Sequence, residues 1–485
     1  MEEVYKTSNP TILVIFGITG DLARRKLVPA LFHLHRKKLL PPLFQVVGFS
    51  RREMSDEELR DEVREMMKVQ ARSDASAVDA FARLFVYRQG MFEHIEGYRA
   101  LAESLGRKDN EWRVCSNKLF YLAVPPEHYE SIFRHVESSG LTEPCSPEEG
   151  WTRVVVEKPF GKNTETAERL DILLGKLFRE EQIYRIDHYL GKETVQNIIA
   201  FRFSNAFLEP AWNRKHIASI AIRMHERNGV ESRGAFYDGI GAFRDVGQNH
   251  LLQLLALFTM DEPENMTADA VRSARLAALR ALKPMTAKEA KNSTRGQYDG
   301  YTEAKGVDPR SETETYFRLN AFLRSPRWRG VPILLESGKK MERTFAEVLV
   351  TFREAPHGLC SILGDGASAR RSMSEEGCAN TLRYEMQPDE KITISFWVKK
   401  PGSDMTIKKQ DFVFDYKALY SPDEFVDPHV DPYRKLLLDA IQGNQTLFVS
   451  TGEIKASWKF VDPIFEAWRK NKVPLKRYKP GTLPS

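Results

Sequence analysis

The chain has few cysteines and no long apolar run, and both absences narrow the kind of protein it can be. Four cysteines occur among 485 residues, at Cys115, Cys145, Cys360 and Cys378. They form no CxxC pair, so we expect neither a zinc site nor a redox motif, and at this density we expect no disulfide framework. No stretch of about 18 or more apolar residues occurs that could cross a membrane. The first ten residues, MEEVYKTSNP, lack a basic segment followed by an apolar one, so we expect no secretory signal and a reducing, cytoplasmic compartment.

The chain also has little excess of positive over negative charge. The chain has 72 Lys and Arg against 67 Asp and Glu, a net charge of +5. A nucleic-acid binder would show a concentrated basic stripe, so we expect no nucleic-acid partner. Hydrophobic residues make up 42% and charged residues 29%, as in an ordinary globular protein long enough for two or three domains.

The first part of the chain alternates apolar runs with helical patterns. Four short apolar runs predict strands buried on both faces, as in parallel sheets: TILVIFG (11–17), FQVVGFS (44–50), KLFYLAVPP (118–126) and TRVVVEKPFG (152–161). Leucines at helical spacing follow the first run in 21–40, and Ser55 with Glu58 has the spacing of a capping box. Residues 1–187 are therefore predicted to form a doubly wound α/β domain of the Rossmann type that binds a dinucleotide.

The second part of the chain has a different pattern. Three β-branched or alternating segments predict strands in a mostly antiparallel sheet: 217–226, 347–354 and 391–399. Residues 245–258 and 266–283 predict helices, and the charged, glycine-containing stretch 290–312 predicts a mobile surface loop. Residues 188–485 are therefore predicted to form a larger β+α domain.

A glycine turn follows the first predicted strand and precedes a helix, in the order G17-I-T-G20-D-L-A23. Glycine lets the backbone approach a phosphate, and the helix start supplies free N–H groups. The spacing is GxxG rather than GxGxxG, and such a turn is often no more than a turn. Its place in the first strand–helix unit favours the phosphate-binding interpretation.

The end of the second predicted strand indicates which dinucleotide is bound. NAD-binding proteins place an acid there to hold the ribose 2′-hydroxyl, but here Ser50 is followed by Arg51 and Arg52. A guanidinium pairs with phosphate through a planar fork, so Arg51 on the 2′-phosphate of NADP is our prediction. The alternative is a solvated arginine pair. Glu53 could partly neutralise the pair, which would allow some use of NAD.

Two further stretches carry charged residues at positions where ligands bind. In VVVEKPFG, Lys158 and a proline with a possible cis bond follow a buried strand, at the sheet edge where ligands of open α/β sheets lie. The alternative is a lysine that faces water. RIDHYLGKE (185–193) contains two basic residues, a histidine and two acidic residues within nine positions. An ordinary surface turn and a phosphate-binding pocket are both compatible with that composition.

GITGDLARRK, VVVEKPFG, RIDHYLGKE and RDVGQNHLLQ occur in this order and spacing. Together they resemble the glucose-6-phosphate dehydrogenase family, whose signature nonapeptide is RIDHYLGKE, and the resemblance runs from about residue 11 to the 470s. It implies oxidation of glucose 6-phosphate at C1 to 6-phosphoglucono-δ-lactone with reduction of NADP, the first step of the oxidative pentose phosphate pathway. It also implies a homodimer or homotetramer formed through the sheet of the second domain.

The resemblance implies a set of site residues and no metal. The implied cofactor-binding residues are Gly17, Ile18, Thr19, Gly20, Asp21, Leu22, Arg24, Arg51, Tyr129 and Lys158. The implied substrate-binding residues are Lys158, His188, Tyr189, Lys192, Glu226, Asp245, Lys339, Arg343 and Gln387. His188, Tyr189 and Lys192 would hold the sugar phosphate by charge and hydrogen-bond donors.

The implied catalytic pair is His250 with Asp187. Loss of hydride from C1 requires removal of the C1 hydroxyl proton, which a neutral imidazole performs well near neutral pH. The acid would orient the imidazole and stabilise its charged form. The alternative for His250 is a core or capping histidine on an apolar helix.

The chain departs from the family pattern in two places. Where many relatives carry an arginine, this chain has Thr344, and Arg343 one position earlier is expected to replace it. Some animal relatives bind a second, structural NADP, but here Glu385 stands where an arginine would be and the tail after Tyr478 is shorter, so no second NADP is expected.

Two other functions fit parts of the sequence. Other Rossmann oxidoreductases share the EKP strand end, but they should lack RIDHYLGKE and the DxxxNH helix. A non-catalytic regulator that responds to NADP should have lost Asp187, Lys192 or His250, and this chain has all three.

Overall fold

The chain forms two compact units. The computed structural model describes residues 9–68, 75–143, 149–355, 378–419 and 431–484. The first unit consists of Met1–Glu193, Asn265–Arg272 and Val426–Lys455, and the second of Thr194–Glu264, Ser273–Phe425 and Ala456–Ser485. Two segments from the later part of the chain therefore join the first unit.

The first unit is built on a seven-stranded sheet with the order β15-β6-β5-β4-β1-β2-β3. Its strands are β1 (Thr11–Phe16), β2 (Phe44–Ser50), β3 (Phe85–Gln89), β4 (Asn117–Leu122), β5 (Thr152–Glu157), β6 (Ile183–Ile186) and β15 (Phe448–Val449). Strands β1 to β6 pair in parallel, and β15 pairs antiparallel with β6. All six residues of β1 are buried, as a strand covered on both faces requires.

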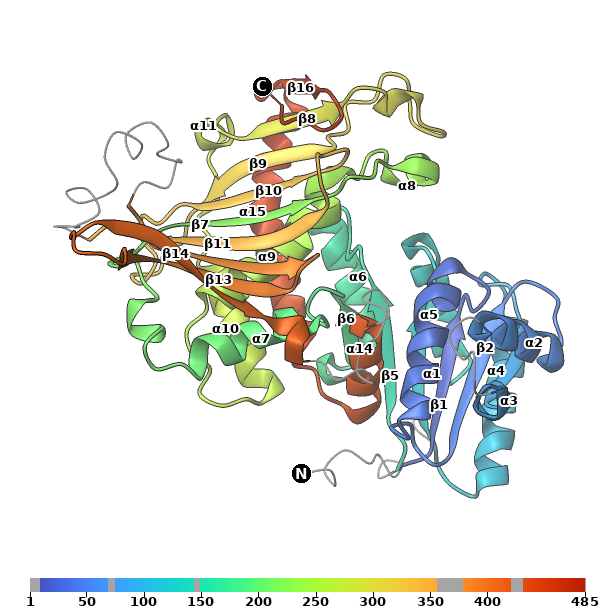
Figure 1. The fold of residues 1–485 in the computed structure, drawn as a ribbon. Coiled ribbons are helices and arrows are strands. Elements are labelled where there is room, and N and C mark those ends of the chain that lie inside the picture. Colours follow the sequence, from blue (N-terminus) through green and yellow to red (C-terminus); the bar gives the residue numbers. More distant parts are fainter. Residues whose placement is uncertain (1–8, 69–74, 144–148, 356–377, 420–430, 485) are drawn as a thin grey trace. The chain divides into compact units, whose positions relative to one another are not determined.

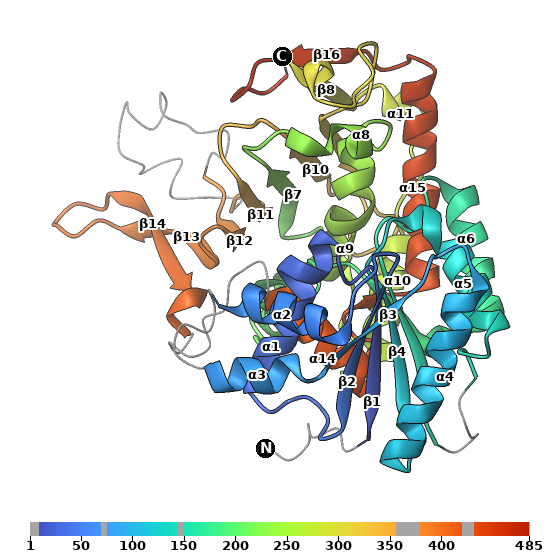
Figure 2. The ribbon, with the colours of Figure 1, turned by 90° about the vertical axis from the view of Figure 1, so that its right-hand side faces the viewer.

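Helices cover both faces of this sheet (Figure 2). They are α1 (Val28–Arg36), α2 (Asp56–Met67), α3 (Ala75–Ala82), α4 (Ile95–Trp112), α5 (Tyr129–Ser138), α6 (Thr164–Leu177) and α14 (Asp431–Gln442), with shorter turns η2 (Ala23–Leu27), η3 (Pro126–His128) and η4 (Glu180–Gln182). Helix α2 begins with the predicted capping box, because the side chain of Ser55 accepts from the backbone N–H of Glu58 at 3.2 Å. The predicted Rossmann-type α/β domain is confirmed.

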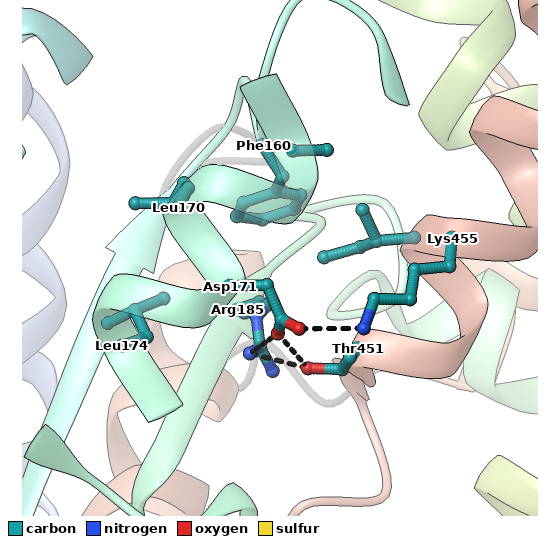
Figure 3. Close-up of a pocket in the computed structure, with 9 residues that line it drawn as sticks. Phe160, Leu170, Asp171, Leu174, Arg185, Thr451 and Lys455 are labelled. Atoms are coloured by element: carbon teal, nitrogen blue, oxygen red, sulfur yellow. Dashed lines mark hydrogen bonds and ion pairs between the residues drawn. The ribbon is translucent and has the colours of Figure 1, made fainter. Parts of the chain in front are cut away.

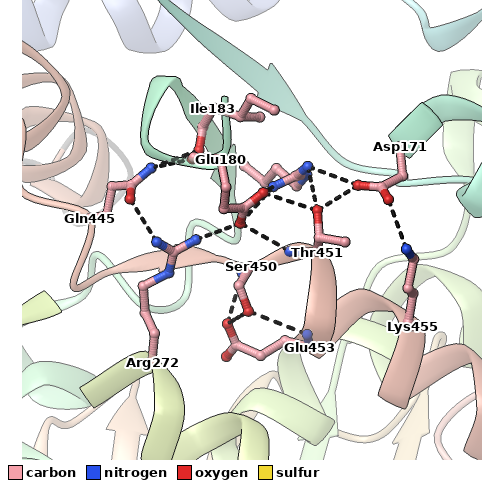
Figure 4. Close-up of polar contacts among 10 residues, drawn as sticks. Asp171, Glu180, Ile183, Arg272, Gln445, Ser450, Thr451, Glu453 and Lys455 are labelled. Atoms are coloured by element: carbon pink, nitrogen blue, oxygen red, sulfur yellow. Dashed lines mark hydrogen bonds and ion pairs between the residues drawn. The ribbon is translucent and has the colours of Figure 1, made fainter. Parts of the chain in front are cut away.

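A buried polar network holds the late segments in the first unit (Figure 4). The side chain of Arg185 in β6 is 2% exposed and donates to Glu180 at 2.9 Å and to Thr451 at 2.8 Å. Arg272 donates to Gln445 at 2.6 Å and to Glu180 at 2.8 Å. Since buried charges require paired and hydrogen-bonded partners, these residues stabilise the discontinuous unit.

The second unit is built on a nine-stranded sheet with the order β14-β13-β12-β11-β7-β10-β9-β8-β16 (Figure 1). Its strands are β7 (Ile217–His225), β8 (Thr294–Tyr298), β9 (Tyr316–Ala321), β10 (Ile333–Gly338), β11 (Phe345–Phe352), β12 (Thr381–Gln387), β13 (Lys391–Lys399), β14 (Ile407–Asp415) and β16 (Leu475–Tyr478). Pairing is antiparallel except between β7 and β10 and between β8 and β16. The predicted, mostly antiparallel sheet is confirmed.

The remaining helices complete the chain. Those of the second unit are α8 (Gly234–Tyr237), α9 (Leu252–Thr259) and α11 (Ala287–Ala290), with turns η5 (Glu209–Ala211), η6 (Glu231–Arg233), η8 (Tyr301–Glu303), η9 (Tyr416–Leu419) and the π-helix η7 (Phe243–Leu251). Three of the five unit boundaries fall within helices, namely α7 (Glu193–Phe203), α10 (Ala268–Arg280) and α15 (Thr451–Arg469). Among the described residues, no helix is both long and apolar enough to span a membrane.

The prediction of a mobile surface loop over 290–312 is wrong for residues 294–298, which form a strand. This stretch contains strand β8, which pairs with both β9 and β16, and Gln297 and Tyr301 are fully buried. Its partner β16 lies far away in the sequence, so the local composition of charged residues and glycine could not reveal the pairing.

The expectation of no disulfide framework is also wrong. Cys115 and Cys378 are both disulfide-bonded. Cys145 and Cys360 lie outside the described residues. A sparse cysteine count and wide spacing describe the sequence only, whereas a disulfide depends on how closely two cysteines approach in space.

Candidate active site

The glycine turn lies where a dinucleotide-binding sheet reverses its strand order. Strand β1 lies between β2 and β4, and Gly17 follows β1 directly. Gly17 has a φ of +85°, and a Cβ there would lie 2.6 Å from the carbonyl oxygen of Ala123, just after β4. Only glycine fits such a conformation and such a close approach. The backbone therefore provides a cradle at the switch point, where a pyrophosphate binds in this fold.

The other predicted residues of this turn differ in exposure. Ile18 is 1% exposed and packs in the core, so only its backbone faces the turn. The hydroxyls of Thr19 and Ser50 lie 3.0 Å apart, which joins the turns after β1 and β2. Asp21 is exposed and lies 3.9 Å from Arg25, and Leu22 precedes the π-helix η2 that begins at Ala23.

The arginine turn after β2 presents one unpaired guanidinium. Arg51 is exposed, and its guanidinium has no hydrogen bond or ion pair with any residue that the structure describes. Its backbone is held, because Gln89 donates to the Arg51 carbonyl at 3.3 Å and Tyr87 donates to that of Ser50 at 3.0 Å. The turn is therefore fixed while the cation stays available to an anion.

Tyrosine side chains hydrogen-bond Glu157 at the end of β5, next to Lys158 and Pro159. The Lys158–Pro159 bond is cis, as the sequence suggested. Tyr121 donates to the buried carboxyl of Glu157 at 2.6 Å, and Tyr433 also hydrogen-bonds it. Burial raises the pKa of Glu157 to about 7, against the opposing effects of Tyr121 and Lys158. Tyr129 is buried and donates to the Glu157 carbonyl at 3.1 Å, so the structure places this predicted cofactor contact against the strand end.

The turn after β6 places Asp187 beside that strand end. Glu157 pairs with Ile186 in the register of β5 and β6, so Lys158 and Asp187 each continue from the same edge of the sheet. Asp187 is 1% exposed and accepts from the backbone N–H of Tyr189 at 3.0 Å. The ring of His188 lies 5.1 Å from that of Tyr189, and the Lys192 ammonium lies 4.8 Å from the centre of the same ring. Three of the predicted phosphate-binding groups are therefore gathered in one turn.

A small hollow in the first unit lies outside the predicted site (Figure 3). It is lined by Phe160, Ala167, Leu170, Asp171, Leu174, Arg185, Thr451, Ile454 and Lys455. Its charged groups pair with one another, since Asp171 contacts Lys455 at 2.9 Å and Arg185 at 3.2 Å. Arg185, the first residue of RIDHYLGKE, is therefore occupied by ion pairs and hydrogen bonds within the fold. None of the predicted ligand-binding residues lines the hollow.

In the second unit, a π-helix carries the predicted base. Helix η7 contains Asp245 in its first turn and His250 near its end, and His250 is 2% exposed. The buried carboxylate of Glu314 accepts from the N–H of Phe243 at 3.1 Å, and the Glu314 carbonyl accepts from the preceding residue, Ala242, at 2.9 Å. Burial raises the pKa of Glu314 to about 7 although Arg244 opposes the shift. Glu314 thus satisfies donors that the start of a helix leaves free.

The turn that carries Lys339 is held by several backbone contacts. Lys339 pairs with Glu226, and its ammonium lies 5.1 Å from the centre of the Tyr237 ring. Its N–H donates to Thr315 at 2.9 Å, and the hydroxyl of Tyr478 donates to its carbonyl at 2.7 Å. The next residue, Lys340, has a φ of +53°, a conformation that most side chains avoid. The turn therefore needs these contacts to hold its lysine in place.

The remaining predicted substrate contacts are more exposed. Arg343 is exposed, with its guanidinium 4.7 Å from the centre of the Phe345 ring. The hydroxyl of Thr344 accepts from the N–H of Arg227 at 2.9 Å, so this side chain serves the turn. Gln387 ends β12 and precedes a cis proline.

Within each unit the structure brings part of the predicted set together. The first unit gathers Lys158 and Asp187–Lys192 at neighbouring strand ends, and the second pairs Glu226 with Lys339. The supporting residues Glu157, Glu314 and Tyr478 were not predicted. Glu157 could have been suspected, because an acid at the end of an apolar strand must find a partner. The sequence offers no comparable signal for the other two.

Family comparisons cover nearly the whole chain. Residues 14–197 match the model described as the glucose-6-phosphate dehydrogenase NAD binding domain, and 199–484 match its C-terminal domain. A glucose-6-phosphate 1-dehydrogenase from Aggregatibacter actinomycetemcomitans is 38% identical over 463 residues, with 93% of this chain and 90% of the relative covered. Glucose-6-phosphate 1-dehydrogenase 6, cytoplasmic, from Arabidopsis thaliana is 35% identical, with 97% and 88% covered.

A solved structure described as glucose-6-phosphate dehydrogenase in complex with its substrate glucose-6-phosphate superposes with a TM-score of 0.87 at 32% identity. The match covers 99% of this chain and 96% of that structure. The chain belongs to the glucose-6-phosphate dehydrogenase family.

Proposed function

We propose that the protein oxidises glucose 6-phosphate at C1 to 6-phosphoglucono-δ-lactone and passes the hydride to NADP. The observation that carries this proposal is the gathering of His188, Tyr189 and Lys192 in one turn beside Lys158 and Asp187. An ammonium, an imidazole and a phenol supply charge and donors for a dianionic phosphate. Full-length similarity to glucose-6-phosphate 1-dehydrogenases supports the choice of sugar phosphate.

His250 acts in this proposal as the general base that takes the C1 hydroxyl proton. Asp187 orients its imidazole and stabilises the charged form, while Asp245 and Glu226 accept hydrogen bonds from sugar hydroxyls. Lys339, Arg343 and Gln387 complete the sugar contacts. The buried position of His250 on a capped helix keeps its ring in a defined place.

NADP is the proposed cofactor, and it supplies the hydride acceptor when bound. The cradle at Gly17, which a Cβ would fill, suits a pyrophosphate, and Ile18 to Leu22 with Arg24, which follow it in the chain, are the further proposed contacts. The unpaired guanidinium of Arg51 suits a 2′-phosphate. Tyr129 and Lys158 lie at the strand end expected to face the nicotinamide.

The experiment that tests this function compares three sugars in the absorbance band of NADPH. With NADP present, glucose 6-phosphate should be oxidised far faster than glucose or galactose 6-phosphate. Glucose lacks the phosphate and tests the phosphate grip, whereas galactose 6-phosphate keeps it and tests the hydroxyl contacts. Equal rates with glucose and glucose 6-phosphate would contradict the proposal.

We further propose a cytoplasmic homodimer or homotetramer that forms through the β13–β14 side of the sheet. Phe396, Phe412 and Phe414 on these two strands are 44%, 58% and 46% exposed, and they share one face of the sheet, because side chains alternate along a strand and the rings of Phe396 and Phe412 lie 5.3 Å apart. Exposed apolar side chains in one patch mark interaction surfaces. Light scattering of the wild type and of Phe412→Glu should show loss of the oligomer in the variant, and an unchanged mass would place the interface elsewhere.

A further inference from the structure

An acid on helix α2 pairs with the arginine turn, and the proposed coenzyme site does not require it. Glu62, in the second turn of α2, contacts Arg52 at 2.8 Å and Arg24 at 3.5 Å. Its side chain is 21% exposed, whereas those of Arg24 and Arg52 are 43% and 57% exposed. One carboxylate therefore engages two of the four arginines that flank the turns after β1 and β2, while Arg25 lies 3.9 Å from Asp21.

We propose that Glu62 is a specificity-determining residue that weakens the preference of this enzyme for NADP over NAD. This inference rests on the proposed NADP site. Glu62 occupies two guanidiniums that would otherwise be free to face a 2′-phosphate, and it leaves Arg51 as the unpaired one among the described residues. It restrains the affinity for the additional phosphate of NADP without contributing to the cradle at Gly17.

The charges near the turn support this role. Glu62 neutralises one of the three positive charges of Arg24, Arg51 and Arg52. A second negative group, the 2′-phosphate, would share these cations with the Glu62 carboxylate. Two negative groups that share the same cations repel each other. A ribose hydroxyl carries no charge, so NAD escapes this repulsion.

Hydrogen bonds fix the position of the helix that carries Glu62 relative to the arginine turn. The capping box at Ser55 fixes the start of α2, and Asp56 accepts from the N–H of Tyr87 at 2.6 Å. Tyr87 in turn holds the carbonyl of Ser50 at 3.0 Å. The helix that carries Glu62 and the turn that carries Arg51 and Arg52 are thus fastened to the same strand, β3. Glu53, the acid that the sequence suggested as a neutralising group, makes no ion pair among the described residues.

The test measures binding of two small probes by calorimetry to the full chain. Adenosine 2′,5′-bisphosphate carries the 2′-phosphate, and AMP does not. In Glu62→Gln, the Kd of the bisphosphate should fall roughly three- to tenfold at low salt, because partly exposed charges act through an effective dielectric constant of about 20. The Kd of AMP should change by less than about twofold, and the gain should shrink at high salt.

Glu65→Gln provides the matched control, because it removes one negative charge from the same helix and its partner is Lys68 rather than an arginine of the turn. It should leave both affinities unchanged. An unchanged or weaker bisphosphate affinity in Glu62→Gln would overturn the inference, as would an equal gain in Glu65→Gln.

Arg51→Ala separates this inference from the proposed coenzyme site. If it weakens the bisphosphate and Glu62→Gln has no effect, the site stands and the role of Glu62 fails. If Arg51→Ala leaves the bisphosphate affinity unchanged, the proposed phosphate position itself is wrong, and the role of Glu62 fails with it. If the inference holds, steady-state kinetics of Glu62→Gln should show a rise in the ratio of kcat/KM for NADP to kcat/KM for NAD that matches the gain in bisphosphate affinity.

Discussion

Among the residues that the structure describes, each unit buries one glutamate whose pKa is raised to about 7, but the two units reach this state by different routes. Glu157 ends a parallel strand of the first unit and is held by Tyr121 and Tyr433. Glu314 in the second unit caps the helix that carries His250, across 71 positions of sequence from its partner Phe243. The first unit thus places its groups by strand order, and the second by contacts between distant segments.

This difference matches the proposed division of work. A parallel sheet brings all its strand ends to one edge, which suits a long coenzyme and a phosphate. A helix held at one end by a buried carboxyl suits a single base that must keep one orientation. If the phosphate grip belongs to the first unit and the base to the second, substitutions in the two units should change different kinetic constants.

The largest effect should come from His250→Asn. We expect kcat to fall on the order of 10²–10⁴, the usual contribution of a general base, while the affinity for glucose 6-phosphate is retained. Steady-state kinetics together with calorimetry checks both quantities. His216→Asn, at an exposed position in the same unit, should leave kcat unchanged. Near-normal turnover in His250→Asn would show that His250 is not the general base.

The pH dependence of stability should come partly from Glu157. Its pKa lies at about 7 in the folded protein against an ordinary value of 4.5, so between these pH values the folded state holds a proton that the unfolded state has lost. The free energy of unfolding therefore falls as pH rises through this window, by on the order of 3 kcal/mol for this group. Glu157→Gln should remove that part of the decline.

Urea unfolding from pH 4.5 to pH 7.5, about the window of this titration, measures this change. Glu314→Gln is the matched substitution in the other unit, where the pKa is also about 7, and it should flatten the decline in the same sense. If neither variant alters the slope, the two carboxyl groups titrate normally and the comparison fails.

A smaller effect is expected for Lys192→Ala. A hydrogen bond from an ammonium to a phosphate contributes about 1.5–3 kcal/mol, so KM for glucose 6-phosphate should rise roughly 10- to 100-fold. The kinetics with free glucose should change little, because glucose lacks the phosphate. Lys176→Ala on the exposed face of α6 is the control. An equal effect on both sugars would contradict a phosphate grip in the first unit.

The smallest effect is expected for Tyr478→Phe in the second unit. The variant loses the hydroxyl that donates to the Lys339 carbonyl, which should raise KM for glucose 6-phosphate a few-fold with little change in kcat and cost about 1 kcal/mol of stability. Tyr301→Phe, whose hydroxyl bonds Asp238 instead, should keep KM unchanged. Equal KM values in the two variants would mean that Tyr478 stabilises the fold without positioning Lys339.

Much of the first unit could be predicted from short stretches of sequence. The apolar run that forms β1, the capping box at Ser55 and the cis proline after Lys158 all agree with the structure. The family motifs also indicated which side chains to examine. Strand β8 was missed because its partner β16 is distant, and the disulfides of Cys115 and Cys378 were missed because spacing along the chain does not report distance in space.

The sequence by itself determined the class of each sheet, because strand periodicity, capping and turn chemistry act over a few residues. It also carried four motifs that resemble those of the family to which the chain belongs. Only the tertiary structure decided that residues 426–455 join the first unit, that Glu62 rather than Glu53 pairs with the arginine turn, and that Glu314 caps the helix of His250. These contacts depend on which distant side chains the fold brings within a few ångströms, because a hydrogen bond forms only over a narrow range of distance and angle and an ion pair between exposed charges weakens as they separate.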